Sequence, residues 1–349
     1  MDNLEEKYIN FLISTNKAAT ATAFSRVFDE KIAHDRITRM LNTTDQFTSQ
    51  SLWQTVKPLC REMESRDAVL IYDDTLIEKP DSSLSELIMY HFDHSKGRSI
   101  RSICMLTALL NSNGANIPVC IDMVQYNEQG EKKSKQEMMR NMLVQCDAND
   151  ITFKHVLADT WYGSAENMQF IVENIKKDFI FPLKANRRVK LAGSRFYTAI
   201  ADLELEEGKV YEALLQGYKS KVYLCSYCVK DGQDKPATLY LVTSDEKLDW
   251  NHMLTCYQRR WQVELFHRSV KQNTAIAKAP LRRTRAMLSH IYASVNAFIK
   301  LELLKLRHKM GHDSIKELIR YAANKASYLA LEKLSTSQMP HLSLFKPGA

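Results

Sequence analysis

The segment YQRRWQVELFHRSVK (residues 257–271) carries side chains of types that do chemistry, at helical spacing. Tyr257, Arg260, Glu264, His267 and Lys271 lie at offsets of 0, 3, 7, 10 and 14 residues. On an α-helix these offsets fall within an arc of about 80°. A carboxylate with a cation on either side suits a site where metal and phosphate meet, because the acid ligates the metal and the cations hold phosphate oxygens.

The plainer interpretation of this stripe is an exposed helix face stabilised by i,i+4 ion pairs. Leu254, Trp261 and Leu265 form an apolar stripe close to it, which predicts that the charged face borders a core rather than free solvent. We expect one long helix over about residues 248–273 to carry both stripes.

Two further acidic positions follow predicted strands. AVLIYDD (68–74) is a continuous apolar run typical of a strand buried on both faces, and FKHVLAD (153–159) is a second one that ends at Asp159. Carboxylates fixed at neighbouring strand ends can hold two divalent ions roughly 3.5–4 Å apart for phosphodiester chemistry. A single aspartate after a strand is more often a turn residue. Strand alternation also leaves Asp73 and Asp74 equivalent, because both faces of this strand are apolar.

The elements that must position these acids predict an α/β fold. Two strand candidates, 101–110 and 117–126, flank the strong hairpin turn Asn113–Gly114. A helix over 133–146, the second acidic strand, a helix starting at Ser164 and a strand over 178–183 follow. The order β, β-hairpin, α, β, α, β is that of an RNase H-like core with a mixed sheet.

Changes of pattern along the chain divide it into five regions. Residues 1–65 have helical periodicity and form a candidate DNA-binding domain, and residues 66–186 form the first part of the core. Short alternating strands indicate a β-rich insertion over 187–246. The second part of the core, with the glutamate helix, covers 247–280, and a helical C-terminal region covers 281–349.

The segment 257–271 also resembles a known family. Its pattern Tyr257-x-x-Arg260-x-x-x-Glu264, with Lys271 seven residues later, is similar to the Y-R-E-K signature of bacterial insertion-sequence DDE transposases. The resemblance covers about residues 68–275. Five other blocks carry it: Asp73-Asp74-Thr75, LADTWYGSAENMQFI (157–171), HFDHSKGRS (91–99), PLKANR (182–187) and YLVTS (240–244).

This resemblance implies roles for single residues. Asp73, Asp159 and Glu264 would bind catalytic metal, and the family pattern is what selects Asp73 over Asp74. Arg260 and Lys271 would contact DNA phosphates near the element's end, and Tyr257 would position that end. The insertion would explain the 105 residues (264 − 159) between the last two acids.

The resemblance further implies cofactors and partners. The metal would be Mg²⁺, as two ions, with Mn²⁺ able to substitute. The partner would be double-stranded DNA, both the terminal inverted repeats of an element and its target, cut by a homodimer. We expect cut-and-paste transposition in which the second-strand step is a hairpin, as in the family, or direct attack on the target.

Several residues near these motifs have competing interpretations. Trp161 and Tyr162 follow the second acid and could stack on a flipped base, with Trp250 as a rival, although packing is the commoner role of such aromatics. His267 could contact DNA or satisfy a neighbour. Two pairs have zinc-like spacing without further ligands nearby: His91 with His94 in a predicted polar loop, and Cys225 with Cys228 on a strand that points them to opposite faces.

Composition agrees with an anionic partner. The formal charge is +7 and the pI is 8.9, with basic clusters at 184–190 (KANRRVK, which contains Arg187), 259–260 and 282–285. A solvated basic face is the ordinary alternative for any one cluster. No apolar stretch approaches the roughly 18 residues of a membrane span, and the acidic first segment does not have the form of a secretory signal. We therefore expect a cytoplasmic, nucleoid-associated protein with reduced cysteines.

Two rival functions remain open at this point. The first is a metal-dependent DNA nuclease on the same core that performs no strand transfer. The second is a DNA-binding regulator whose acids are structural.

Overall fold

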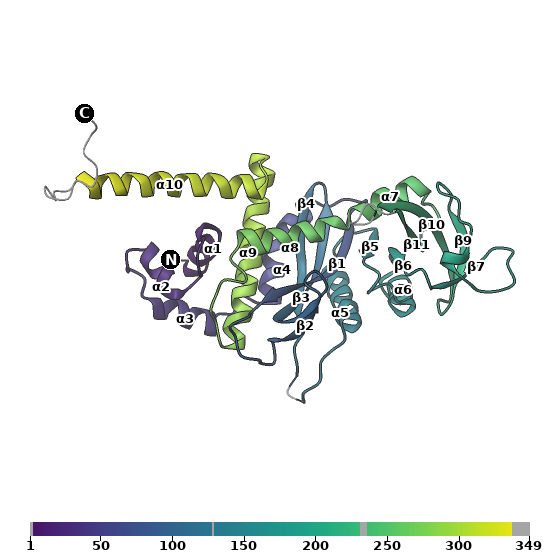
Figure 1. The fold of residues 1–349 in the computed structure, drawn as a ribbon, viewed down its shortest axis with the longest axis horizontal. Helices are drawn as coiled ribbons and strands as arrows, with labels where there is room; N and C mark the ends of the chain where they lie inside the picture. The colour runs from purple at the N-terminus through teal and green to yellow at the C-terminus, as the bar shows by residue number, and fades with distance from the viewer. Residues whose placement is uncertain (1–2, 128, 231–235, 337–349) are drawn as a thin grey trace.

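A computed structural model describes residues 3–127, 129–230 and 236–336. Figure 1 shows a mixed sheet in the middle of the molecule, with helices from both ends of the chain on one side and a β-rich part on the other. The predicted α/β class with a mixed sheet and helical ends is confirmed.

The N-terminal region consists of four helices, α1 (Leu4–Ser14), α2 (Ala21–Val27), α3 (His34–Thr43) and α4 (Ser49–Glu62). Helix α4 starts with a capping box in which Thr48 and Ser51 satisfy each other's backbone amides. Helices α1 and α3 pack against the C-terminal helix α9 (Thr284–His308), and α4 packs against strand β4 (Ala115–Met123). Helices of the N-terminal and C-terminal regions therefore pack together on the same side of the sheet.

The core of the sheet is built around the long strand β3 (Arg98–Ser112). It pairs antiparallel with β1 (Val69–Glu78), β2 (Met89–Asp93) and β4, and the β3–β4 hairpin turns at Asn113 and Gly114, which both have positive φ, as predicted. Strands β5 (His155–Ala158) and β6 (Asp178–Leu183) run parallel to β1. The connections are α5 (Lys135–Ala148) and α6 (Ala165–Phe170), which continues as the π-helical segment η1 (Ile171–Ile175).

Strand β1 does not end at its acids, contrary to the prediction. It continues to Glu78, because β3 pairs with it along its whole length, from Val69↔Asn111 to Glu78↔Ser102. Its pairing with β5 stops earlier, at Tyr72↔Ala158. Asp73 is therefore the first residue of β1 beyond the parallel pair.

The β-rich part comprises β7 (Arg188–Leu191), β8 (Thr198–Ala199), the 3₁₀ turn η2 (Ile200–Asp202), β9 (Tyr211–Leu215), β10 (Lys221–Lys230) and β11 (Pro236–Thr243). Strand β11 pairs antiparallel with β6, so these strands extend the core sheet to 11 strands instead of forming a separate layer. Cys225 is buried and Cys228 is exposed on β10, as strand alternation predicts.

The predicted long helix over 248–273 is wrong in one respect, because it is two helices, α7 (Trp250–Gln258) and α8 (Trp261–Asn273). The turn at Arg259–Arg260 uses tighter bonds, Arg259 N–H to Cys256 O (3.2 Å) and Arg260 N–H to Tyr257 O (2.8 Å). Tertiary contacts hold Arg259 there, because its guanidinium donates to Asn111 Oδ1 and O (2.8 and 2.6 Å) and to Asp67 O (2.6 Å).

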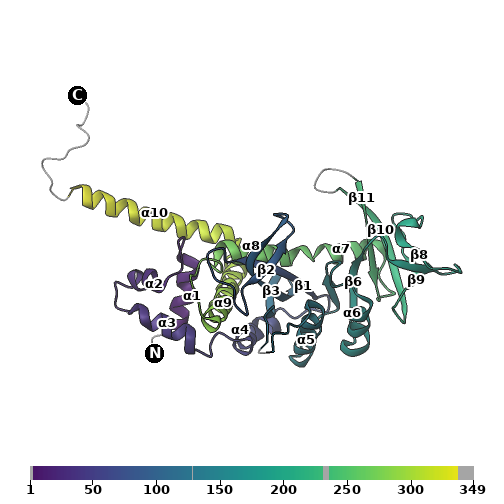
Figure 2. The same cartoon turned by 60° about the horizontal axis from the view of Figure 1, so that its bottom comes forward.

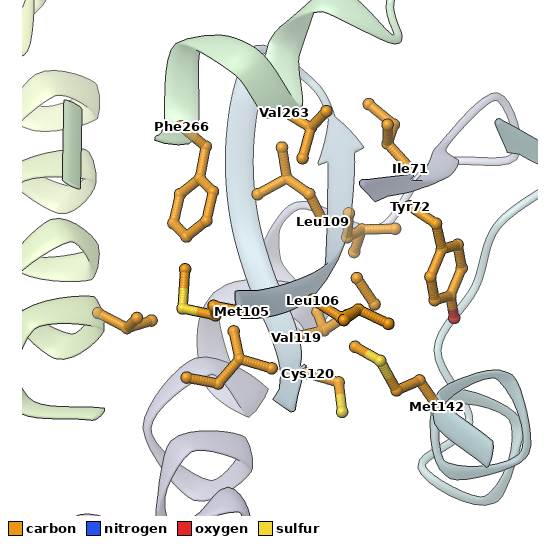
Figure 3. Packing of buried hydrophobic residues seen from close by; sticks show 14 of the residues in the cluster. Ile71, Tyr72, Met105, Leu106, Leu109, Val119, Cys120, Met142, Val263 and Phe266 are labelled. Atoms are coloured by element: carbon orange, nitrogen blue, oxygen red, sulfur yellow. The ribbon is translucent and has the colours of Figure 1, made fainter. Parts of the chain in front are cut away.

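Helices α8 and α5 cover opposite faces of β1 and β3. In Figure 3, Val263 and Phe266 of α8 pack against Leu109 and Met105, while Tyr72 and Leu106 point toward the Met142 side. The buried side of α8 is Val263, Phe266, His267 and Val270. The predicted apolar stripe is wrong for two of its three members: Trp261 is 53% exposed and Leu265 is half-buried, because the sheet lies on another side of the helix. Its third member, Leu254, is buried on α7.

The C-terminal helix α10 (His312–Thr336) projects from the body of the molecule in both Figures 1 and 2. It contacts α1, α8 and α9. No helix within the described ranges is long and apolar enough to cross a membrane.

Candidate active site

Two aspartates meet at one edge of the parallel pair β1–β5. Because Tyr72 pairs with Ala158, the next residues, Asp73 and Asp159, continue the two strands side by side. Burial, followed by the negative charge of Asp159, raises the pKa of Asp73 to about 7. Burial also raises the pKa of Asp159. Two partly buried carboxylates at this spacing repel each other, so the pair is arranged to receive positive charge.

A turn after β5 fixes the direction of Asp159. Its Oδ1 accepts the backbone N–H of Trp161 (2.9 Å) and that of Tyr162 (3.4 Å). Trp161 itself is 59% exposed next to the acid, whereas Tyr162 is buried. Of the predicted stacking aromatics, Trp161 is thus accessible, while Tyr162 and Trp250 are engaged in the protein, since Trp250 Nε1 donates to Ser226 O (3.0 Å).

Arg260 connects the first aspartate to the glutamate. Its Nη2 lies 2.6 Å from Glu264 Oε1, and its Nη1 lies 3.6 Å from Asp73 Oδ2. The guanidinium also lies over the Tyr257 ring, 6.0 Å from the centroid. The turn between α7 and α8 thus brings Tyr257, Arg260 and Glu264 to the edge where Asp73 and Asp159 lie.

Asp74 points to the other face of β1. Asp73 is opposite Thr107 and Asp74 is opposite Leu106 in the β1–β3 ladder, so consecutive acids alternate between the α8 and α5 sides. Asp74 accepts hydrogen bonds from Lys135 Nζ (2.6 Å) and Tyr162 Oη (2.8 Å), and Cys104 Sγ lies 3.3 Å away.

The charge of Asp74 is balanced within the protein. Burial disfavours the ionised form, yet the Lys135 ammonium outweighs it and the pKa of Asp74 is lowered. Burial is the main cause of the raised pKa of Asp159, and the negative charge of Asp74 raises it further. Sequence reasoning missed Lys135, and no local signal could have found it, because it lies 61 residues from Asp74 on another element.

The DNA contact predicted for His267 is not compatible with its position. His267 is buried against β3, with Nε2 3.2 Å from Thr107 Oγ1. Burial, followed by the Lys271 charge, lowers its pKa to about 3, so the ring is neutral. His267 lies at one limit of the 80° arc predicted from the sequence, and that side of α8 faces the sheet.

Two other predicted DNA contacts lie outside the acidic cluster. Lys271 is exposed two turns beyond Glu264 on α8. Arg187 is half-buried before β7, and burial lowers its pKa. Arg187 makes no contact with the three acids in the described part of the chain.

A separate group with metal-ligand chemistry lies at the other end of the strands. His155, Asp178 and Asp245 have ligand atoms within 4.8 Å of one another, and they are the only such group among the described residues. Protein groups already occupy the ligand atoms of this group. Lys154 Nζ and His155 Nε2 each lie 3.0 Å from Asp245 Oδ2, and Ser244 Oγ donates a hydrogen bond to Asp178 (2.7 Å). This group ties β5, β6 and the exit of β11 together.

The ligand atoms of Asp73, Asp159 and Glu264 do not form such a group within 4.8 Å in the described ranges. Their donors are nevertheless carboxylate oxygens, the ligands that Mg²⁺ prefers. Among the described residues, Asp73 has one ion pair, to the Arg260 guanidinium at 3.6 Å. His91 lies within β2 rather than in the predicted polar loop, and neither it nor His94 belongs to a ligand group in the described ranges.

Comparison with known proteins identifies the family. The family model described as "Transposase DDE domain" matches residues 64–297, more than half of the chain. The chain belongs to the DDE transposases. No curated protein gave a match.

The matched part of this transposase starts just before β1 and ends within α9. It contains all three acids, the β-rich strands and the α7–α8 turn, and it confirms the predicted insertion-sequence DDE transposase. DDE transposase domains use divalent metals, in agreement with the carboxylate donors at this edge.

Proposed function

We propose that this transposase moves its element by cut-and-paste, using Asp73, Asp159 and Glu264 as the metal ligands. The observation that carries the proposal is the meeting of Asp73 and Asp159 at one sheet edge, with Glu264 joined to Asp73 through Arg260. Water would first hydrolyse a phosphodiester at the element's end. The freed 3′-hydroxyl would then attack the opposite strand, giving a hairpin, or the target DNA.

The three acids would hold Mg²⁺, which Mn²⁺ could replace. When bound, two such ions activate the attacking oxygen and stabilise the leaving oxygen. Arg260 now neutralises Glu264 and Asp73, and the same planar guanidinium can pair with a phosphate when DNA occupies the site. The Tyr257 ring packs against the Arg260 guanidinium and would hold it in place. Lys271 would add a second positive charge on the same side of α8, and the exposed Trp161 side chain would stack on an unpaired base.

A labelled element end incubated with Mg²⁺ tests the proposal against its two rivals. Transposition predicts joined products, a nuclease predicts cut products only, and a DNA-binding regulator predicts a shifted band without cleavage. Cut products that never join, with target DNA in excess, would rule out the transposase proposal in favour of the nuclease.

Action as a homodimer on DNA is part of the proposal, because two ends must be cut in concert. Helix α10 supports it, because it projects from the body of the molecule and carries large exposed apolar side chains that a second copy would cover, among them Tyr321 (71% exposed), Tyr328 and Leu331. Light scattering of the protein with end DNA should give the mass of two chains per complex. A mass of one chain under cleavage conditions would contradict this part.

A further inference from the structure

An open pocket of about 560 Å³ lies where the end of α8 meets the beginning of α10. Four cations line it: Lys271 on α8, Lys278 in the connection to α9, and Lys316 and Arg320 on α10. We call these four residues and the space between them the basic notch. The four cations come from three separate segments, and none of them belongs to the basic runs 184–190, 259–260 and 282–285.

Few acids face the notch: Asp313 lines it, and the charges of Asp93 and Glu78 act on Lys271. None of its four cations forms an ion pair within 4.0 Å with an acid of the described ranges. The one acid in its wall, Asp313, already accepts a hydrogen bond from Asn273 Nδ2 (3.0 Å). Elsewhere on the surface the cations Arg39, Lys96 and Arg285 do pair with acids. The notch therefore gathers cations that repel one another.

One of the four cations, Lys316, caps the C-terminal end of α1. Lys316 is buried and its Nζ contacts the carbonyl oxygens of Ile13 and Thr15 at the end of α1, where the helix dipole is negative. Lys278 Nζ likewise reaches Asn16 O (3.4 Å). Burial, followed by the charges of Arg320 and Lys278, lowers the pKa of Lys316 to about 8. Carbonyl oxygens carry no net charge, so the repulsion among the cations persists.

The notch continues the stripe that starts at the acids. Lys271 follows Glu264 by seven residues, so its Cα lies about 10 Å further along α8 and on nearly the same side. Duplex DNA rises roughly 3.4 Å per base pair, which makes this distance about three steps. A duplex whose reacting phosphate lies at Glu264 would therefore bring its backbone close to the notch.

We infer that Lys278 and Arg320, together with Lys271, hold the DNA backbone about three base pairs from the reacting phosphate. This inference rests on the proposed function, and it adds a second, non-catalytic anchor made partly by the C-terminal helix. The notch would contact only phosphate groups, so it would contribute affinity for DNA and position on the duplex rather than sequence preference.

The test is DNA binding by Lys278→Gln/Arg320→Gln, with both side chains exposed in the folded protein. Fluorescence anisotropy with an end duplex, without divalent ions so that no cleavage occurs, measures affinity over a series of KCl concentrations. The double variant should bind about 10-fold or more weakly at moderate salt, and the slope of log K against log [KCl] should fall by about one per lost contact. Lys57→Gln/Arg66→Gln removes the same charge from exposed positions away from the notch and should change both values little.

Unchanged affinity and salt slope in the notch variant, with a normal melting curve, would overturn the inference. Inorganic phosphate separates a free-anion site from a DNA anchor. If phosphate raises the melting temperature of the wild type but not of the variant, while DNA affinity is equal, the notch binds free anions and the inference also fails. A wild type that binds no DNA would instead contradict the proposed function itself.

Discussion

Replacing Glu264 by Gln, or Asp159 by Asn, should lower the rate of strand cleavage by a factor on the order of 10³ or more. This factor is equivalent to a loss of about 4 kcal/mol of transition-state stabilisation. Each change removes a negative ligand oxygen while leaving the size of the side chain nearly unchanged. DNA affinity should stay equal or increase, because one negative charge near the phosphates is lost. Single-turnover cleavage of a labelled end in Mg²⁺, together with anisotropy, measures both quantities.

Asp73 and Asp74 provide a matched pair of variants within this experiment. Asp73→Asn should lose cleavage as Asp159→Asn does, because Asp73 shares the edge with Asp159 and contacts Arg260. Asp74→Asn breaks the 2.6 Å pair with Lys135 and should cost about 1–3 kcal/mol of folding free energy, yet the folded protein should still cut DNA. The opposite result, an inactive but folded Asp74→Asn and an active Asp73→Asn, would make Asp74 the first acid.

Full cleavage by folded Glu264→Gln or Asp159→Asn in Mg²⁺ would contradict the assignment of all three acids. Loss of both cleavage and DNA binding would point to unfolding, so each variant needs a melting curve. Trp161→Ala should leave the acids and the melting curve unchanged, because its side chain is exposed, so any loss of cleavage by it reports the proposed base contact rather than a lost metal ligand.

Replacing Glu302 by Ala should lower the free energy of unfolding by about 3–5 kcal/mol, the cost of leaving buried partners without their counter-charge. The Glu302 side chain is 2% exposed, and its Oε1 accepts from Asn116 N (2.8 Å) and Lys305 Nζ (2.6 Å). Its Oε2 lies 2.9 Å from His312 Nε2. Urea unfolding of the purified variant measures the change.

The same network holds α8, the helix that carries the proposed metal ligand Glu264. His312 Nδ1 lies 2.9 Å from Ser269 Oγ on α8, so Glu302 connects β4, α9 and α10 to the element that carries Glu264. We therefore expect Glu302→Ala to slow cleavage as well, even where the protein is folded. Asp35→Ala, which breaks the exposed Arg39–Asp35 pair, should change the free energy of unfolding by less than about 0.5 kcal/mol. An equal effect of the two variants would contradict the predicted role of Glu302.

The pH dependence gives an independent check of Glu302. Burial opposes ionisation, yet His312 and Lys305 outweigh it and the pKa of Glu302 is lowered in the folded protein. A lowered folded-state pKa stabilises the protein above the unfolded value of about 4.3, and this contribution is lost as the pH falls through the folded-state pKa. The difference in unfolding free energy between wild type and Glu302→Gln should thus be largest at neutral pH and shrink in acid.

Much of the fold could be predicted from local pattern. Continuous apolar runs identified the strands that carry Asp73 and Asp159, and Asn113–Gly114 identified the hairpin, because left-handed backbone conformations favour these two residue types. Helical spacing also grouped Tyr257, Arg260 and Glu264, and these side chains do lie close together, although on two helices joined by a turn rather than on one. Each of these inferences depends on neighbours in the chain.

Other features were decided by partners far away in the sequence. The helix breaks at Arg259 because Asn111 and Asp67 bind its guanidinium, and His267 is buried because the sheet lies on its side of α8. The β-rich strands extend the core sheet because β11 pairs antiparallel with the edge of β6 that β5 leaves open.

The sequence by itself determined which side chains the proposed site contains: three acids, an arginine and a tyrosine at spacings that suit metal and phosphate. Only the tertiary structure decided which way the two adjacent aspartates point. A strand that is apolar on both faces has no preferred orientation of its own, so its side-chain directions are fixed by register with β3 and β5. That register turns Asp73 toward Arg260 and Asp74 toward Lys135.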